Sequence, residues 1–244
     1  MRAAARIVAE ADRSGVTRLA VLRGESPLLL RRTGPRDTTS ATVHLVGGAA
    51  GPLRGDDLLL EIEVGPGAHL EIRSVAATLL LPGRPAPPSL LTVRATVAGS
   101  LRWLPEPAIA AAGCDHHAST AVEVADGGSL LWRDDLVCGR HDEPSGSVRS
   151  DVTIRYAGRT LYRHRLTVGP DAPGWSGAAV LGNARATGSA VLAGPGLPVP
   201  HLPAEGAAVM ALAGPGVLAT ATGADIREVQ AALDPFCAAM PAPV

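Results

Sequence analysis

Alternation of apolar and polar residues with a period of two runs through most of this chain and limits the folds that it can adopt. Within residues 58–64, leucine, isoleucine or valine stands at every even position, and glutamates stand at 61 and 63. The same alternation returns at residues 91–97, 122–124 and 148–156. Side chains that alternate in this way point to opposite faces of a β-strand. The pattern therefore predicts a chain built mainly from short strands.

Glycine and proline turn signals separate these runs at intervals of roughly 8–14 residues. The signals stand at residues 65–67, 98–99, 126–128, 157–158, 194–196 and 214–216. Short connections favour hairpins, and we expect one across Gly65–Gly67, between strands near 58–64 and 69–73. We therefore expect an all-β sandwich, barrel or stack of short, mostly antiparallel strands, with one or two short helices.

One helix is predicted near residues 223–233. Thr222 and Asp225 resemble a capping box, and apolar residues then recur with helical spacing. Asp234-Pro235 is expected to end this helix, because a proline removes a backbone donor. The tail beyond Phe236 is expected to fray.

The composition excludes several classes of function. All 22 basic residues are arginine, so the chain can hold neither a phosphate-binding loop of the G-x-x-x-x-G-K-[ST] kind nor a lysine Schiff base. A net charge of −1 with few aromatic residues predicts no binding to nucleic acid. No linker-like tract divides the 244 residues, so we expect a single domain over residues 1–244.

The cysteines and the longest apolar tract indicate the compartment. Three widely spaced cysteines do not suggest a secreted disulfide framework, and residues 1–12 do not resemble a signal peptide. The tract 207–221 is shorter than the ~18–20 residues that span a bilayer, and it is broken at Gly214-Pro-Gly216. We expect two buried strands there, no membrane segment and a cytoplasmic protein.

The segment Cys114-Asp-His-His117 is the best candidate for a metal site. In an extended chain Cys114 and His116 project to one side, and His117 projects to the other. Thiolate and imidazole suit Ni²⁺, Cu and Zn²⁺, and a closed site would need further ligands. These ligands would have to come from His69, Cys138, His141 or another subunit. The alternative is a polar loop with an incidental thiol.

Two further groups of charged residues admit a structural or a functional interpretation. Asp56 and Asp57 are adjacent at the start of a strand and should point to opposite faces, which argues against a shared-proton pair. The functional interpretation of this pair is acid-base chemistry, and the structural alternative is that the two aspartates fix the turn and the register of the strand. Arg140 either forms an ion pair with a nearby carboxylate or contacts a partner.

Taken together, several short motifs in this order resemble the urease accessory protein UreD (UreH) family. Each motif alone is weak, and together they cover nearly the whole chain. In one departure from the family pattern, Glu106-Pro107 stands where many members have Gln-Glu. The matching stretches are Gly47-Gly48, Pro52–Leu58, Val64–Ala68, Ser74–Thr78, Trp103-Leu-Pro105, Leu131–Arg140, Gly174-Trp-Ser176 and Gly182–Arg185.

The resemblance implies a fold and a role. The fold would be an elongated, β-helix-like stack of strands. The role would be non-catalytic: a scaffold that works with UreF and the GTPase UreG to deliver Ni²⁺ to apo-urease. It would hold no tightly bound cofactor and contact Ni²⁺ only transiently. We assign Cys114, His116 and His117 to that contact. The partner or relay positions would be Asp56, Trp103, Glu106 and Arg140.

Two other functions remain open from the sequence. One is a β-barrel metalloenzyme that uses Cys114, His116 and His141, with Asp56 as the base. The other is a β-rich interaction module unrelated to nickel. The sequence contains no G-x-S-x-G motif and no H-E-x-x-H motif, so it does not indicate a hydrolase or a metalloprotease of the classes that carry them.

Overall fold

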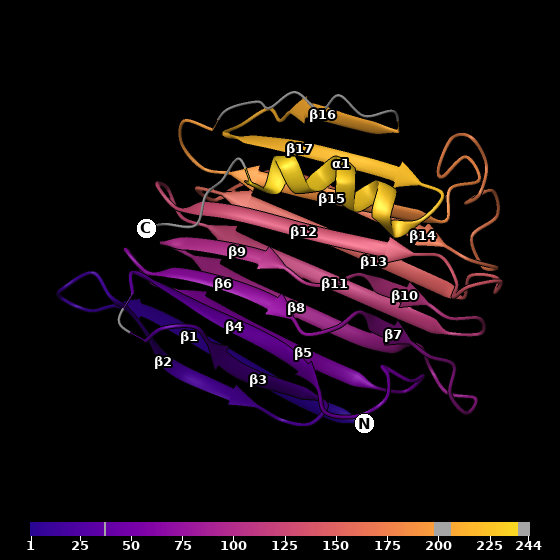
Figure 1. Ribbon diagram of the computed structural model, residues 1–244, viewed down its shortest axis with the longest axis horizontal. Helices are drawn as coiled ribbons and strands as arrows, with labels where there is room; N and C mark the ends of the chain where they lie inside the picture. The colour runs from indigo at the N-terminus through magenta and orange to yellow at the C-terminus, as the bar shows by residue number, and fades with distance from the viewer. Residues whose placement is uncertain (37, 198–205, 239–244) are drawn as a thin grey trace.

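A computed structural model shows two β-sheets packed face to face with one helix on the outside (Figure 1). It describes residues 1–36, 38–197 and 206–238. The part of the tail at 239–244, which the sequence predicts to fray, lies outside the described residues. The expectation of an all-β stack is confirmed.

Sheet A has seven strands in the order β14-β13-β11-β8-β5-β1-β2, and sheet B has ten, with β16-β17-β15-β12-β9-β6-β4-β3 as its main path. The strands of sheet A are β1 (Arg2–Ala11), β2 (Thr17–Gly24), β5 (Asp57–Val64), β8 (Ser89–Val97), β11 (Asp115–Val124), β13 (Ser147–Tyr156) and β14 (Arg159–Val168). Those of sheet B are β3 (Leu28–Thr33), β4 (Ser40–Gly47), β6 (His69–Ser74), β7 (Thr78–Leu80), β9 (Ser100–Leu104), β10 (Ala108–Ala110), β12 (Ser129–Val137), β15 (Ala186–Ala193), β16 (Ala207–Ala211) and β17 (Gly216–Gly223).

The central strands form three stacked coils, in which the chain crosses from sheet A to sheet B: β5 to β6, β8 to β9 and β11 to β12. Equivalent strands of successive coils therefore pair in parallel. Nine of the fifteen strand pairings in the described residues are parallel. The prediction of mostly antiparallel strands is wrong, and so is the hairpin at Gly65–Gly67, which is a crossing between the sheets. An alternating pattern cannot distinguish parallel from antiparallel pairing, because both arrangements place successive side chains on opposite faces of the sheet.

The crossings stack on one another through backbone hydrogen bonds. Ala98 N donates to Val64 O at 2.8 Å, and Ala125 N donates to Val97 O at 2.8 Å. Gly99 permits this close approach, because a Cβ atom there would lie 2.1 Å from Ala68 O. The turn signals in the sequence thus mark the points where one coil rests on the next.

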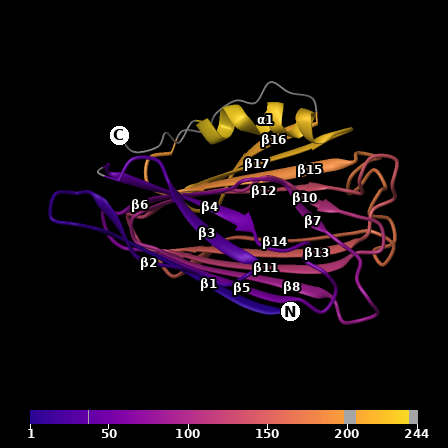
Figure 2. The same ribbon diagram turned by 60° about the horizontal axis from the view of Figure 1, so that its bottom comes forward.

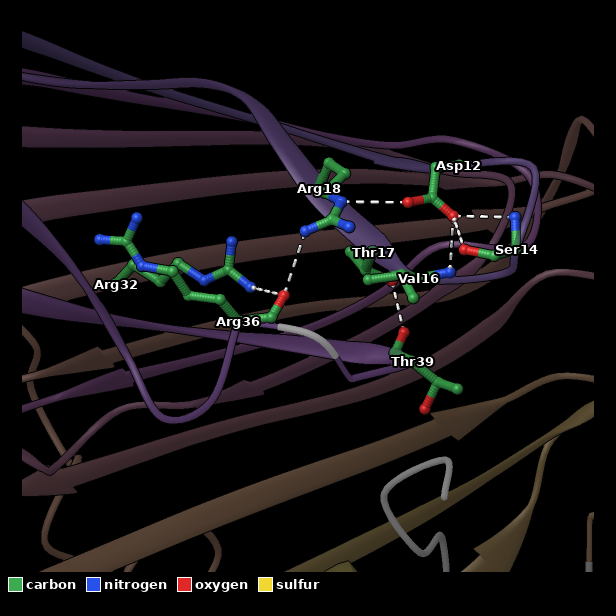
Figure 3. A network of polar contacts seen from close by, with 8 residues as sticks. All are labelled: Asp12, Ser14, Val16, Thr17, Arg18, Arg32, Arg36 and Thr39. Carbon is green, nitrogen blue, oxygen red and sulfur yellow. Dashed lines mark hydrogen bonds and ion pairs between the residues drawn. The ribbon is translucent and has the colours of Figure 1, made fainter.

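Antiparallel hairpins close both ends of the stack. At the N-terminal end the β1–β2 turn is held by Asp12, whose carboxylate accepts a hydrogen bond from Arg18 Nε at 3.0 Å (Figure 3). The Arg18 guanidinium also donates to Arg36 O, and Thr17 Oγ1 donates to Thr39 O. These contacts tie β2 of sheet A to the loop before β4 of sheet B. They hold the two sheets together at this end of the stack.

The main core fills the space between the sheets, and a second core lies under the helix on the outside of sheet B (Figure 2). Strands β12, β15 and β17 are consequently buried on both faces. Leu130 contributes to the first core and Leu131 to the second. Near-continuous apolar runs are typical of strands covered on both sides.

Helix α1 (Ile226–Ala238) lies near the predicted helix, but it begins three residues after the predicted start at residue 223 and ends beyond residue 233. Thr222 lies in β17, so the predicted capping box of Thr222 and Asp225 does not form. Asp225 is its N-cap, and its Oδ1 accepts a hydrogen bond from Arg227 N at 2.8 Å. The helix continues through Pro235, in contrast to the predicted stop. Burial of Phe236 and Cys237 against sheet B offsets the backbone donor that the proline lacks. No helix in the described residues is long and apolar enough to cross a membrane.

Candidate functional site

Two tryptophans stack on the inner face of sheet B. Trp103 on β9 lies opposite Trp132 on the neighbouring parallel strand β12. Their ring centroids are 4.7 Å apart with an interplanar angle of 8°. Both side chains are nearly fully buried. The pair fills the space between the sheets and presents two indole N–H donors in the same region.

Both indoles donate to the carboxylate of Asp134. Trp132 Nε1 lies 2.6 Å from Oδ2, and Trp103 Nε1 lies 3.3 Å from Oδ1. Asp134 keeps some accessible surface, but the protein atoms packed around its carboxylate desolvate it. Burial raises the pKa of Asp134 to about 6, although the hydrogen bonds from Trp132 and Trp103 oppose the rise. An acid between the sheets therefore titrates close to neutral pH.

Hydroxyl groups from both sheets lie near this carboxylate. Ser189 on β15 is the register partner of Asp134. Tyr162 on β14 comes from sheet A and hydrogen-bonds with Ser189. Burial and the charge of Asp134 raise the pKa of Tyr162 to about 12, so the phenol stays protonated. The cluster offers hydroxyl oxygens and one ionisable acid.

Sequence reasoning missed Asp134, although its signal was present. Strand parity puts Asp134 on the same face as Trp132, since the two are two residues apart. Arg133 and Asp135 flank Asp134 in the sequence. They lie on the opposite face, beneath the helix.

The segment Cys114–His117 alternates between faces as the sequence predicts. Cys114 and His116 are buried toward the space between the sheets, whereas His117 is partly exposed on the outer face of sheet A. His116 Nδ1 lies 2.8 Å from Ser89 Oγ. Burial and nearby His117 lower the pKa of His116 to about 4, and burial raises the pKa of the Cys114 thiol to about 11. At neutral pH both groups are uncharged.

No closed metal site forms around these residues within the described parts of the chain. No group of three or more His, Cys, Asp or Glu residues there is arranged to hold a metal ion. His141, a possible additional ligand, lies in a different loop with 97% of its side chain exposed. His69 is on β6.

Asp56 and Asp57 have separate environments. Asp56 is buried, and its carboxylate accepts hydrogen bonds from the Met1 amino group at 2.7 Å and from Leu53 N at 2.9 Å. Asp57 is exposed beside Arg2. These contacts give Asp56 a structural role at the start of β5, as the turn interpretation predicts.

Glu106 and Arg140 lie at the surface. The backbone N–H of Glu106 donates to Ser74 Oγ at 2.9 Å, which holds the chain after β9. Arg140 forms a two-pronged ion pair with Glu143, with both N–O distances 2.7 Å. That pair matches the local ion-pair interpretation of Arg140.

Comparison with known proteins connects this architecture to a family. The family model described as "UreD urease accessory protein" matches residues 1–243. The chain belongs to this UreD family. "Urease accessory protein UreD 3" of Streptomyces griseus is 45% identical over 243 residues, covering 96% of this chain and 95% of the relative. "Urease accessory protein UreD" of Streptomyces coelicolor is 42% identical over 241 residues, covering 96% and 94%.

Two of the stretches that resemble the UreD family meet in space. The guanidinium of Arg185, from Gly182–Arg185, donates to three carbonyl oxygens of the loop after β12. These belong to Cys138, Arg140 and Glu143. Gly139 adopts φ +87°, and a side chain there would collide with Glu143 O. In this UreD-family chain the motif residues fix a loop whose tip is exposed.

Proposed function

We propose that the chain is a non-catalytic, cytoplasmic urease maturation factor that works with UreF and UreG to deliver Ni²⁺ to apo-urease. Membership of the UreD family carries this proposal. The absence of lysine supports it, because a chain without a phosphate-binding loop needs a partner for GTP hydrolysis.

The chemistry of the interior supports a role in passing an ion rather than keeping it. A closed site of three or four ligands would retain Ni²⁺. The described residues instead place isolated polar groups between the sheets, among them Asp134 and His116. We propose no tightly bound cofactor, with Cys114, His116 and His117 as transient Ni²⁺ contacts.

The positions assigned to partners or to a relay divide by their environment. Arg140 and Glu106 are exposed, so we propose them as partner contacts. Trp103 and Asp56 are buried and act through position: Trp103 orients Asp134, and Asp56 fixes the start of β5.

The geometry gives little support to the metalloenzyme alternative. Its three ligands would be Cys114, His116 and His141, and His141 extends into solvent on a separate loop. That enzyme should retain stoichiometric metal after desalting, and less than about a tenth of an equivalent excludes it.

Deletion of the gene tests the proposed function. We expect urease that is inactive and poor in nickel at low external Ni²⁺, and restoration by the wild-type chain. Cys114→Ala, His116→Gln and His117→Ala should each lower the nickel content of urease several-fold. His44→Ala, a change outside the interior, is the control. Full urease activity in the deletion strain at low nickel would contradict the proposal.

A further inference from the structure

The outer face of sheet A is left uncovered by the described elements, whereas α1 covers the outer face of sheet B (Figure 2). Residues that face outward on neighbouring strands line up in rows. One row contains Ser119, Asp151 and Arg165, and the next contains Ala121, Thr153 and Arg163. Polar and small side chains thus form a broad, flat surface over β11, β13 and β14.

A hollow of about 510 Å³ interrupts this surface. Ser119 and Thr153 line it, together with Arg163 and Arg165 of the edge strand β14. The hollow exists because short side chains stand next to long ones on adjacent strands. It can admit a few side chains of another molecule.

The charges around the hollow are unevenly compensated. Asp151, which also lines the hollow, receives hydrogen bonds from Arg149 Nε at 2.7 Å and from Arg165 Nε. Arg155 pairs with Glu123 at 3.2 Å. Four of the five arginines of β13 and β14, namely Arg149, Arg155, Arg163 and Arg165, therefore face two carboxylates, whereas the whole chain carries a net charge of −1. In the described part of the chain, Arg163 has no carboxylate partner.

We infer that this hollow, with Arg163 at its edge, is a docking surface for an acidic segment of a protein partner in the urease maturation assembly. The inference rests on the proposed function. Arg163 supplies an uncompensated planar guanidinium, which binds a carboxylate through two parallel hydrogen bonds. Ser119 and Thr153 supply hydroxyl groups for the backbone or polar side chains of the same segment.

A protein carboxylate fits this surface better than a nucleic acid does. Asp151, which lines the hollow, stays anionic: partial burial raises its pKa, but hydrogen bonds from Arg165 and Arg149 lower it overall. A continuous run of phosphates would have to pass over this carboxylate. A short acidic segment can place its carboxylates at Arg163 and avoid Asp151.

Arginines on an edge strand also discourage pairing with other sheets. Protection of the edge would account for charged residues on β14, but negative charges would protect it as well as positive ones. Reversing the sign keeps the edge charged and removes the attraction for carboxylates, so Arg163→Glu separates the two roles.

The test is co-expression of the full chain with UreF, UreG and apo-urease, followed by affinity capture at increasing NaCl. We expect Arg163→Glu to lower capture of at least one partner by about tenfold or more, and Arg163→Lys to lower it less. Wild-type capture should weaken as salt rises. Arg13→Glu, an exposed arginine in the β1–β2 turn with the same change in charge, is the matched control and should capture normally.

Three outcomes decide the inference. Equal capture by wild type and Arg163→Glu, with equal melting temperatures, overturns it and leaves the proposed function intact. A wild-type chain that captures none of these proteins overturns both. Loss of retention on a DNA duplex by Arg163→Glu, with protein capture unchanged, would also overturn it.

Discussion

The two outer faces of the sandwich differ, although strands with alternating side chains form both. On sheet B, strands β12, β15 and β17 turn apolar side chains outward, and α1 covers them. On sheet A, strands β11 and β13 turn Ser119, Asp151 and Thr153 outward to solvent. One face is thus part of the core and the other is available to a partner. The difference shows which surface stabilises the fold and which can change without unfolding it.

The ion pairs on the two outer faces differ in the same way, since the arginine under α1 is buried and those on sheet A are exposed. Under α1, Arg133 forms ion pairs with Asp135 at 2.8 Å and with Asp234 at 2.6 Å. Gly188 makes room for Asp135, since a Cβ atom there would lie 2.3 Å from its Oδ1. On sheet A the comparable pair, Arg165 with Asp151, is largely exposed.

The largest expected difference comes from removing one arginine on each face. Arg133→Met should destabilise the protein by about 3–5 kcal/mol, because Asp135 would remain buried without a counter-charge. Arg165→Met should cost about 0.2–1 kcal/mol, since water screens the exposed pair. Chemical denaturation measures both values. The double variant Arg133→Met/Asp135→Asn should recover part of the loss; equal effects on the two faces would contradict the comparison.

Leucine truncation tests the same division without charge. Leu233→Ala, on the buried face of α1, should cost about 2–5 kcal/mol from lost burial and the cavity left behind. Leu90→Ala, on the outer face of sheet A with 40% of the residue exposed, should stay within about 0.5 kcal/mol. Denaturant midpoints measured at a constant m-value provide the comparison. A loss above about 2 kcal/mol at Leu90 would show that the outer face of sheet A is covered.

The pH dependence of stability sharpens the comparison between the interior and the uncovered face. The pKa of Asp134 rises from its ordinary value of 3.8 to about 6, so below pH 4 the folded state bears no cost from this group. As pH rises from about 4 to about 6, stability is lost, by up to about 3 kcal/mol at about 1.4 kcal/mol for each pKa unit. Asp134→Asn should lack this loss when unfolding free energies at pH 4 and pH 7 are compared.

Asp151→Asn provides the control of opposite sign. The pKa of Asp151 is lowered, so its carboxylate contributes stability that is present above its ordinary pKa and is lost as pH falls through the lowered one. Asp151→Asn should therefore remove stability at pH 7 and have little effect at the lowest pH. The same pH response in the two variants would contradict the assignment of Asp134 to the interior.

Period-two alternation predicted the strands well and the path between them poorly. The runs near residues 58–64, 91–97 and 148–156 are β5, β8 and β13. Whether a turn folds a strand back on its own sheet or leads to the opposite sheet depends on tertiary pairing. The Gly65–Gly67 turn was therefore assigned to a hairpin although it crosses between sheets. The same limit explains the incorrect preference for antiparallel pairing.

The candidate site was predictable only in part. Alternation placed Cys114 and His116 on one side and His117 on the other, as the structure has them. The contact between Trp103 and Asp134 joins residues 31 apart in sequence and depends on the register of β9 against β12. The hollow at Arg163 depends on β11, β13 and β14 lying side by side. Neither arrangement follows from local pattern.

The stacked coils also fix distances along the molecule. Equivalent strands in successive coils lie about 4.8 Å apart, so each coil adds that length between the N-terminal hairpins and the hollow beside β14. Because a coil contacts mainly its neighbours, a change in the number of coils would shift the two ends in fixed steps and leave both surfaces intact. The number of coils thus sets the distance between the N-terminal hairpins and the hollow beside β14.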